Sequence, residues 1–297
     1  MAKTKILYAM GCEVNSASKE GFGEAIKIAQ AADVAVVVVG GKSGLTLDCT
    51  CGEMRDRAEL SLPGVQEELV KAVYETGTPI VGILVNGRPF TFGWMAEEIP
   101  AIVEAWLPGE EGGNAVADVL FGNYNPGGKL PLSFPERVGQ IPIYYGHKPS
   151  GGRSQIWGNY VETSTSPVFE FGYGLSYTTF EFSCLRIEPN RVPLTGKASI
   201  KVDVKNTGPR AGEEVVQLYV NDRVASVTRP VKELKGFKRI TLEPAETKTV
   251  EFELLTELLT FYDKDMKLVI EPGIFKVMVG RSSKDIALEG EFEVIAA

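Results

Sequence analysis

The stretch Asp33-Val34-Ala35-Val36-Val37-Val38-Val39-Gly40 decides the fold of the first half of the chain. An unbroken apolar run of this length is typical of a strand that is buried on both faces of a parallel sheet. The residues before it, 18–32, carry Phe22, Ala25, Ile26 and Ala29 at helical spacing. We therefore predict a helix followed by a buried parallel strand.

The same alternation of helix and strand continues outward from this stretch. Pro63 suits the first turn of a helix, PIVGILVNG (79–87) and AIVEAW (101–106) resemble further buried strands, and residues 114–121 resemble a short helix. KILYAMG (5–11) resembles a strand at the start. The pattern predicts a doubly wound, flavodoxin-like α/β fold. With only about four strands visible, we expect this sheet to be truncated.

A second pattern begins near residue 183. Short stretches alternate apolar and polar residues and are separated by turn residues such as Asn206-Thr207-Gly208 and Glu271-Pro272-Gly273. The expected strands are Ser199–Val204, Val215–Val220, Val231–Phe237, Lys248–Leu254 and Gly273–Val279. About seven short strands in roughly 110 residues predict an all-β sandwich. We therefore expect an α/β domain over 1–145, a connecting segment over 146–182 and a β-sandwich over 183–297.

Composition and charge exclude several classes of function. The chain has 297 residues, a formal net charge of −8 and a sequence pI of about 5.0, which argues against a nucleic-acid-binding face. No apolar run approaches the roughly 18 residues of a membrane span, so we expect no membrane partner. The N-terminal sequence shows no signal peptide, which leaves the compartment open with the cytoplasm slightly favoured.

Histidine and cysteine content restrict the possible chemistry. His147 is the only histidine, and it lies in a loop far from any nucleophile elbow, so a histidine-based hydrolase mechanism is disfavoured. Cys49 and Cys51 have too few potential co-ligands for a zinc site. We expect neither a metal nor an organic cofactor, and we assign acid–base chemistry to carboxylates.

The loop after the first buried strand is the expected site. It runs over residues 40–64, whereas loops between strand and helix usually have about two to six residues. Its charged residues are Lys42, Asp48, Glu53, Arg55, Asp56, Arg57 and Glu59. Because ligands bind at the carboxyl ends of parallel strands, this loop predicts a substrate site with a proton-transferring carboxyl group. A solvated charged loop is the alternative, and the glycine spacing disfavours a phosphate loop.

Several motifs together resemble the C-terminal half of family 3 glycoside hydrolases. In the first half these are Gly52-Glu53-Met54-Arg55-Asp56-Arg57, Leu62-Pro63-Gly64-Val65-Gln66, Asn86-Gly87-Arg88-Pro89, residues 106–113 (WLPGEEGG), residues 125–131 (NPGGKLP) and residues 171–177 (FGYGLSY). In the second half, residues 205–208 (KNTG), 212–219 (GEEVVQLY) and 229–237 (RPVKELKGF) resemble the fibronectin type III-like domain of the same family.

This resemblance implies a retaining exo-β-glycosidase of the β-glucosidase or β-xylosidase type. Such enzymes have a TIM-barrel domain whose aspartate nucleophile lies in a Ser-Asp-Trp or Ser-Asp-Tyr setting, and neither tripeptide occurs in this chain. Glu53 matches the family's general acid/base. Because a retaining enzyme needs two carboxyl groups about 5–5.5 Å apart, we expect the chain to be inactive without the barrel.

The resemblance also suggests further site residues and partners. Asp48, Asp56 and Arg57 are expected to shape the loop or contact the sugar, and Arg153 to contact substrate from the connecting segment near the active-site rim. Glu110 and Glu111 better suit the start of a helix. The expected partners are an oligosaccharide or aryl glycoside, the missing TIM-barrel domain and a second copy in a homo-oligomer. The alternative function is a non-catalytic carbohydrate-binding or assembly module.

Overall fold

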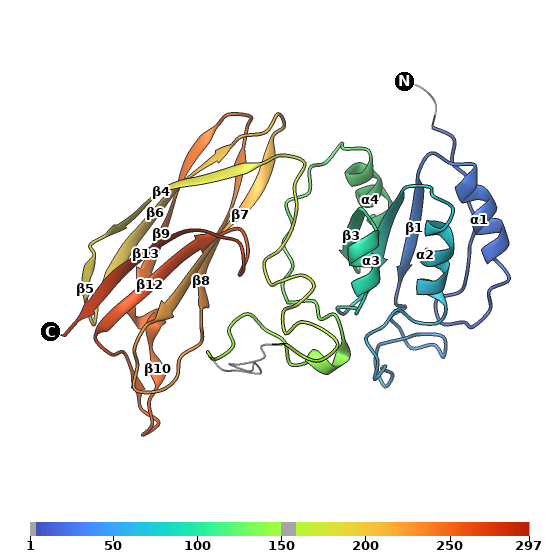
Figure 1. Cartoon of the computed structure of the whole chain (residues 1–297). Coiled ribbons are helices and arrows are strands. Elements are labelled where there is room, and N and C mark those ends of the chain that lie inside the picture. The colour runs from blue at the N-terminus through green and yellow to red at the C-terminus, as the bar shows by residue number, and fades with distance from the viewer. Residues whose placement is uncertain (1–3, 150–158, 297) are drawn as a thin grey trace. The chain divides into compact units, whose positions relative to one another are not determined.

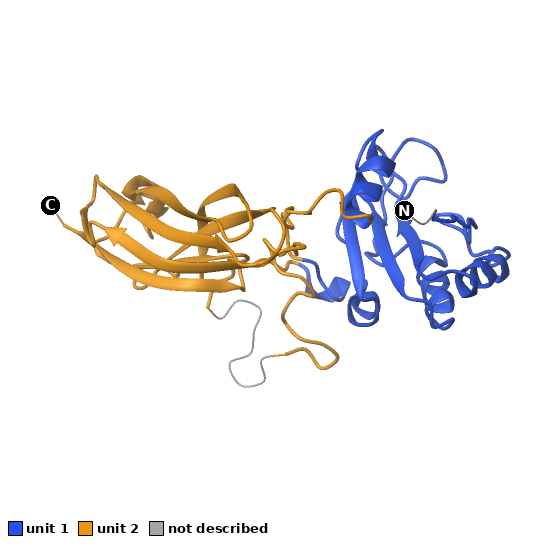
Figure 2. Ribbon diagram, turned by 90° about the horizontal axis from the view of Figure 1, so that it is seen from above, with its two compact units in different colours: residues 1–120, 134–141 blue, residues 121–133, 142–297 orange. Residues whose placement is uncertain are grey.

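The computed structural model describes residues 4–149 and 159–296. The chain forms two compact units, shown in Figure 2. Residues 1–120 with 134–141 make up one, here called the α/β unit, and residues 121–133 with 142–297 make up the other, here called the sandwich unit. In the described residues, no helix is both long and apolar enough to cross a membrane.

A parallel three-stranded sheet forms the centre of the α/β unit. Its strands, in spatial order, are β1 (Ala35–Gly40), β2 (Ile80–Val85) and β3 (Ala101–Trp106). The helices are α1 (Phe22–Gln30), α2 (Gln66–Tyr74), α3 (Gly93–Glu98) and α4 (Gly112–Leu120), labelled with β1 and β3 in Figure 1. A short 3-10 helix, η1, spans Val138–Gln140. The alternation of helix and parallel strand confirms the predicted α/β class.

Helix periodicity predicted only part of the buried face of these helices, since Phe22 and Ile26, at the predicted spacing, are partly exposed. Ala25 and Ala29 are the buried residues of α1, and Leu69 and Val73 are buried in α2. Helices α2 and α3 meet edge-to-face through Tyr74 and Trp94, whose ring centroids are 5.4 Å apart. The apolar stripes of the helices therefore build the core, as the spacing indicates.

Several sequence-based expectations for this unit are wrong in the described residues. KILYAMG (5–11) forms no strand, and the sheet has three strands instead of about four. Strand β1 is not buried on both faces, because Val36 and Val38 are 48% and 62% exposed. An apolar run shows only that its residues can be buried, and β1 lies at the edge of the sheet where the cover over one face is incomplete. The helix expected from Pro63 begins at Gln66.

The sandwich unit consists of two sheets whose strands pair antiparallel, except for β5, which pairs parallel to β13. This confirms the all-β prediction. One sheet has the order β5-β13-β12-β7-β8 and the other β4-β6-β9. The strands are β4 (Phe180–Glu188), β5 (Arg191–Pro193), β6 (Lys197–Asn206), β7 (Gly212–Asp222), β8 (Glu233–Leu242), β9 (Thr247–Leu255), β12 (Gly273–Gly280) and β13 (Ile286–Ile295). The short strands β10 (Phe261–Tyr262) and β11 (Leu268–Val269) pair with each other, and η2 spans Thr256–Leu259.

Strict alternation in β6 shows how the two sheets share a core. Ala198, Ile200, Val202 and Val204 are fully buried, whereas the residues between them are more exposed. Since successive side chains of a strand point to opposite faces, every second residue enters the core.

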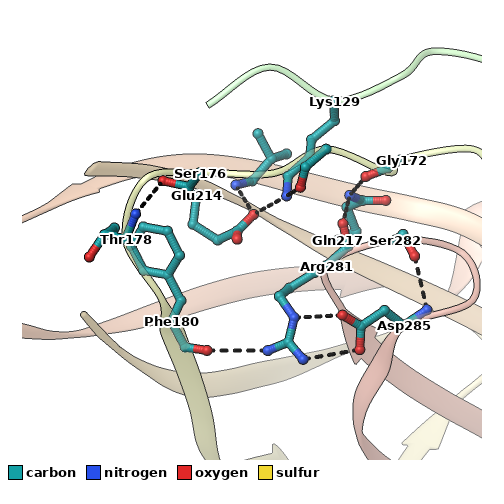
Figure 3. A network of polar contacts seen from close by, with 12 residues as sticks. Lys129, Gly172, Ser176, Thr178, Phe180, Glu214, Gln217, Arg281, Ser282 and Asp285 are labelled. Atoms are coloured by element: carbon teal, nitrogen blue, oxygen red, sulfur yellow. Dashed lines mark hydrogen bonds and ion pairs between the residues drawn. The ribbon is translucent and has the colours of Figure 1, made fainter. Parts of the chain in front are cut away.

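Buried polar contacts tie the stretches before the sandwich to its strands. Lys129 and Glu214 form an ion pair of 2.9 Å with both side chains almost fully buried. Gln217 of β7 donates to the carbonyl oxygens of Gly172 and Arg281 at 3.1 and 2.6 Å. Figure 3 shows these contacts together with the two-pronged pairing of Arg281 and Asp285. They explain why residues 121–133 belong to the sandwich unit.

Candidate active site

The loop over residues 40–64 leaves the carboxyl end of β1, where the chain passes close to β2. Gly40 has a left-handed φ of 150°, and a Cβ atom there would lie 1.9 Å from the carbonyl oxygen of Val85. Gln66, buried at the start of α2, accepts a hydrogen bond from Gly40 N at 2.7 Å and donates to Gly40 O and Val14 O at 2.8 Å each. One side chain therefore fixes the end of the strand against the start of the next helix.

The first half of the loop folds back on itself. Thr50 N donates to Lys42 O at 2.8 Å, and Gly44 N donates to Cys51 O at 3.1 Å. Gly52 has a φ of 136°, and a Cβ atom on it would lie 2.3 Å from Gly44 O. Only glycine fits this close approach of two backbones. These contacts fix the backbone immediately before Glu53.

Glu53 lies in a tight turn that projects into solvent. Arg55 N donates to Gly52 O at 3.3 Å across the turn, and Met54 takes a left-handed φ of 61°. The Glu53 side chain is exposed, and within the described residues its carboxylate has no hydrogen bond or ion pair. The loop thus presents an uncommitted carboxyl group from a defined turn.

Asp56 and Arg57, predicted to shape the loop or bind substrate, have local partners. Asp56 accepts a hydrogen bond from Arg57 N at 2.7 Å and pairs with Arg88. The Arg57 amide, followed by the Arg88 guanidinium, lowers the pKa of the Asp56 carboxyl. Arg57 donates from its guanidinium to Ser61 O at 2.9 Å. Both contacts hold the second half of the loop.

Asp48 has a separate partner on the same loop. It forms an exposed ion pair with Lys42. The Lys42 ammonium, followed by the Thr46 hydroxyl, lowers the pKa of Asp48 to about 2. Asp48 is therefore an ionised group at some distance along the chain from the turn that carries Glu53.

A polar cavity of about 300 Å³ lies against the loop, near the lower end of the range for ligand pockets. Its lining residues are Asn15, Cys49, Thr50, Met54, Arg55, Asp56 and Arg57. The structure therefore brings Asp56 and Arg57 together at one cavity, while Glu53 and Asp48 are not among the lining residues.

Other sequence-predicted residues lie elsewhere or are not described. Arg153 falls outside the described residues. Lys148, from the same connecting segment, donates to Thr228 O at 2.6 Å in the sandwich unit. Glu111 accepts a hydrogen bond from Asn114 at 2.6 Å beside the start of α4, which fits the helix-start interpretation. Residues 4–149 and 159–296 contain no group of three or more potential metal ligands.

Arg88 and Glu104 were not selected from the sequence. Arg88 follows β2 in the Asn-Gly-Arg-Pro motif, and the shared edge of parallel strands was the available signal that it could meet the loop after β1. Burial raises the pKa of Glu104 to about 7, although the hydrogen bonds that it accepts from Trp106 N and the Asn86 amide lower the pKa in part. These bonds measure 3.0 and 3.3 Å and fix Glu104 to its own sheet.

Comparison with known families shows where this arrangement belongs. Residues 3–177 match the model of the glycosyl hydrolase family 3 C-terminal domain. The chain belongs to glycoside hydrolase family 3. Residues 214–283 match a fibronectin type III-like domain, in agreement with the observed sandwich. The resemblance carried by the Gly-Glu-Met-Arg-Asp-Arg loop and the downstream motifs is thereby confirmed.

Individual relatives are β-xylosidases and β-glucosidases. The chain is 49% identical to a β-xylosidase of Formosa agariphila, covering 94% of this chain and 38% of that protein. It is 42% identical to a periplasmic β-glucosidase of Salmonella typhimurium, covering 97% and 38%. A β-glucosidase from Listeria innocua in complex with glucose superposes with a TM-score of 0.87 at 38% identity, covering 95% and 39%. The chain thus spans well under half the length of these relatives.

Proposed function

We propose that this chain supplies the acid/base loop of a retaining exo-β-glycosidase that removes sugars from the nonreducing ends of β-glucosides or β-xylosides. Glu53 is the general acid/base, and the nucleophile comes from a TIM-barrel domain. Without that domain, the chain does not hydrolyse glycosides. The names of the relatives support these two substrate classes.

The exposed, unpaired carboxyl of Glu53 is the observation that carries this proposal. Gly52 and the turn to Arg55 fix its backbone, while its side chain has no partner among the described residues. A structural carboxyl on such a loop would be expected to bond locally, as Asp48 and Asp56 do. A carboxyl that acts on a bound sugar has to remain available to it.

The proposed reaction needs two carboxyl groups on either side of the glycosidic bond. The barrel aspartate attacks the anomeric carbon and forms a glycosyl ester, while Glu53 gives its proton to the departing oxygen. Glu53, now a carboxylate, then removes a proton from a water molecule that attacks the ester, which releases the sugar and restores both groups. Asp56 and Arg57 hold the loop that carries this proton donor.

The test of this proposal supplies the TIM-barrel domain from a second protein. The chain is mixed with the separately produced TIM-barrel domain of a close relative, and hydrolysis of 4-nitrophenyl β-glucoside and β-xyloside is measured. Neither part alone should act, whereas the mixture should. Glu53→Gln should lower kcat by about 10² to 10⁴-fold, the usual contribution of a general acid/base. Turnover by the chain alone that depends on Glu53 would contradict the proposed dependence on the barrel.

Exposed apolar residues on the α/β unit support a protein partner. Ile6, Tyr8 and Met10 are largely exposed, as are Val36 and Val38 of β1. A contiguous patch of exposed apolar groups usually marks a surface that another protein covers, and we propose that these residues form one. We propose that the barrel-containing part of the enzyme binds to this surface. In its absence, a second copy of the chain binds there instead.

A cavity in the sandwich unit favours the alternative carbohydrate-binding module. Its volume is about 550 Å³, and its lining includes Asp222, Arg229 and Lys276. Within the described residues, Asp222 Oδ2 and Arg229 Nε are buried without a hydrogen-bond partner. Calorimetric titration with cello- and xylo-oligosaccharides tests this alternative. Binding that is lost in Asp222→Asn, together with an inactive mixture in the experiment above, would favour the module over the enzyme.

A further inference from the structure

The second half of the loop that carries Glu53 is held by contacts from a neighbouring segment. Arg88 forms an ion pair with Asp56, three residues after Glu53. Thr91 N donates to Leu60 O at 2.8 Å, and Thr91 forms a parallel bridge with Ser61. All these contacts come from residues 86–92, which follow β2 and are here called the clamp segment.

The clamp segment is itself firmly fixed at its first residue. Asn86 is 1% exposed, and its backbone N donates to Trp106 O at 2.9 Å. Its side-chain amide donates to Glu104, which also accepts the backbone N–H of Trp106. Trp106 has a left-handed φ of 52°, so this carboxyl supports a strained end of β3.

The other end of the clamp segment is buried in the core of the α/β unit. Phe90 and Phe92 are almost fully buried. The Phe92 ring meets Phe134 edge-on at 5.7 Å, and Trp106 meets the same ring at 5.9 Å. Arg88 therefore extends from a short segment that is held at both ends.

We propose that Arg88 is a positioning residue for Glu53 and that the clamp segment sets where the acid/base turn stands. The inference rests on the proposed function of Glu53. The Arg88 side chain is mostly buried, whereas Asp56 is 70% exposed, so one partner of the pair is fixed and the other belongs to the loop. A fixed guanidinium holding a loop carboxylate limits the positions that the turn can reach.

Hydrogen–deuterium exchange on the chain itself tests whether Arg88 holds the turn. Arg55 N and Arg57 N donate hydrogen bonds in the wild-type turn. In Arg88→Ala these two amides should exchange about three- to fivefold faster, the range expected for one partly exposed ion pair. Gly44 and Thr50, whose amides bond within the first half of the loop, should exchange at the wild-type rate.

Matched variants separate this role from general loosening of the loop. Lys42→Ala removes the other ion pair of the loop, with Asp48, and should leave Arg55 and Arg57 unchanged. The charge-reversed pair Asp56→Arg with Arg88→Asp should restore slow exchange at Arg55 N, whose acceptor is Gly52 O. Arg57 N is not a reporter in this variant, because the reversal removes the Asp56 carboxylate to which it donates. Unchanged exchange in Arg88→Ala, or equal acceleration in Lys42→Ala, would overturn the inference.

A second readout uses the chain combined with a barrel domain. Substrates with a poor leaving group depend on proton donation, whereas 2,4-dinitrophenyl glycosides depend on it little. Arg88→Ala should therefore lower kcat/KM at least about tenfold more for a methoxyphenyl glycoside than for a dinitrophenyl glycoside, as Glu53→Gln does. Equal losses on both substrates would overturn the positioning role. An inactive mixture would contradict the proposed function, while the exchange experiment would still decide the role of Arg88.

Discussion

Glu104 is a buried carboxyl group close to the loop, and burial shifts its pKa. It lies on β3, accepts hydrogen bonds from Trp106 N and the Asn86 amide, and its pKa is raised to about 7 mainly by burial. A carboxyl with such a pKa often marks an active site. Here both oxygens are used to hold the ends of β2 and β3, so we assign it a structural role.

This shift makes the stability of the α/β unit depend on pH. The folded-state pKa of about 7 exceeds the ordinary value of 4.5, so the folded unit holds this proton more tightly than the unfolded chain. The free energy of unfolding should therefore fall as pH rises from about 4.5 to 7. The slope approaches about 1.4 kcal/mol per pH unit in the middle of this range and is smaller near both pKa values, so the total fall is roughly 2–3 kcal/mol.

Glu104→Gln should remove this dependence, because the amide does not titrate and can still accept the bond from Trp106 N. Urea unfolding followed by tryptophan fluorescence at several pH values measures it, since Trp94 and Trp106 both lie in this unit. The variant should be the more stable protein at pH 8. Parallel pH profiles for the two proteins would disprove the assignment.

Among the helices and strands, hydrophobic periodicity predicted the long ones. It did not predict the short ones, or whether a strand finds a partner that is distant in sequence. The apolar run of β1 and the alternation of β6 were sufficient to place both strands. The six-residue helix α3 shows no repeat long enough to recognise. Residues 5–11 include a short apolar run that suits a strand, but a strand also requires a hydrogen-bonded neighbour, and the described chain offers none.

In the candidate site, too, local sequence features could be predicted, whereas contacts between distant segments could not. The loop could be selected because it is long, charged and placed after an apolar strand, and Glu53 within it because the surrounding motif resembles that of family 3 glycoside hydrolases. Arg88 could not be paired with Asp56 from sequence, because that contact depends on how the loops after β1 and β2 meet in space. Sequence therefore predicted the position of the loop but not what holds it.

The buried pair of Lys129 and Glu214 should be a major support of the sandwich unit. Glu214→Gln keeps the acceptor for Val215 N but leaves the Lys129 ammonium buried without its carboxylate. Losing one partner of a buried pair costs about 3–5 kcal/mol, so the unfolding transition followed by circular dichroism should shift accordingly. The exposed pair of Lys197 and Glu253 provides the control, and Glu253→Gln should change stability by less than about 1 kcal/mol. Equal shifts in the two variants would contradict this prediction.

At the scale of the whole molecule, the uncovered apolar residues of the α/β unit govern behaviour in solution. Ile6, Tyr8 and Met10 together with Val36 and Val38 expose apolar surface, and β1 has an unpaired edge among the described strands. Both features promote association with another protein surface.

We predict that the purified chain self-associates as its concentration rises. Val36→Lys combined with Val38→Lys should shift it towards monomer, because lysine introduces like charges on the associating surface. Val224→Lys, at an exposed apolar residue of the sandwich unit, serves as the control and should have no effect. Sedimentation velocity over a concentration series measures the outcome, and a strictly monomeric wild-type chain would contradict it.

The path of the chain between its two compact units also limits how this protein can exchange parts with its relatives. The chain changes unit after Leu120, after Ser133 and after Ile141. A recombination event with one breakpoint near residue 141 would therefore bring in a foreign sandwich without its own residues 121–133. In such a hybrid, Glu214 would come from one parent and its buried partner Lys129 from the other. Successful gene shuffling should consequently favour either parents that share both residues or breakpoints close to Leu120.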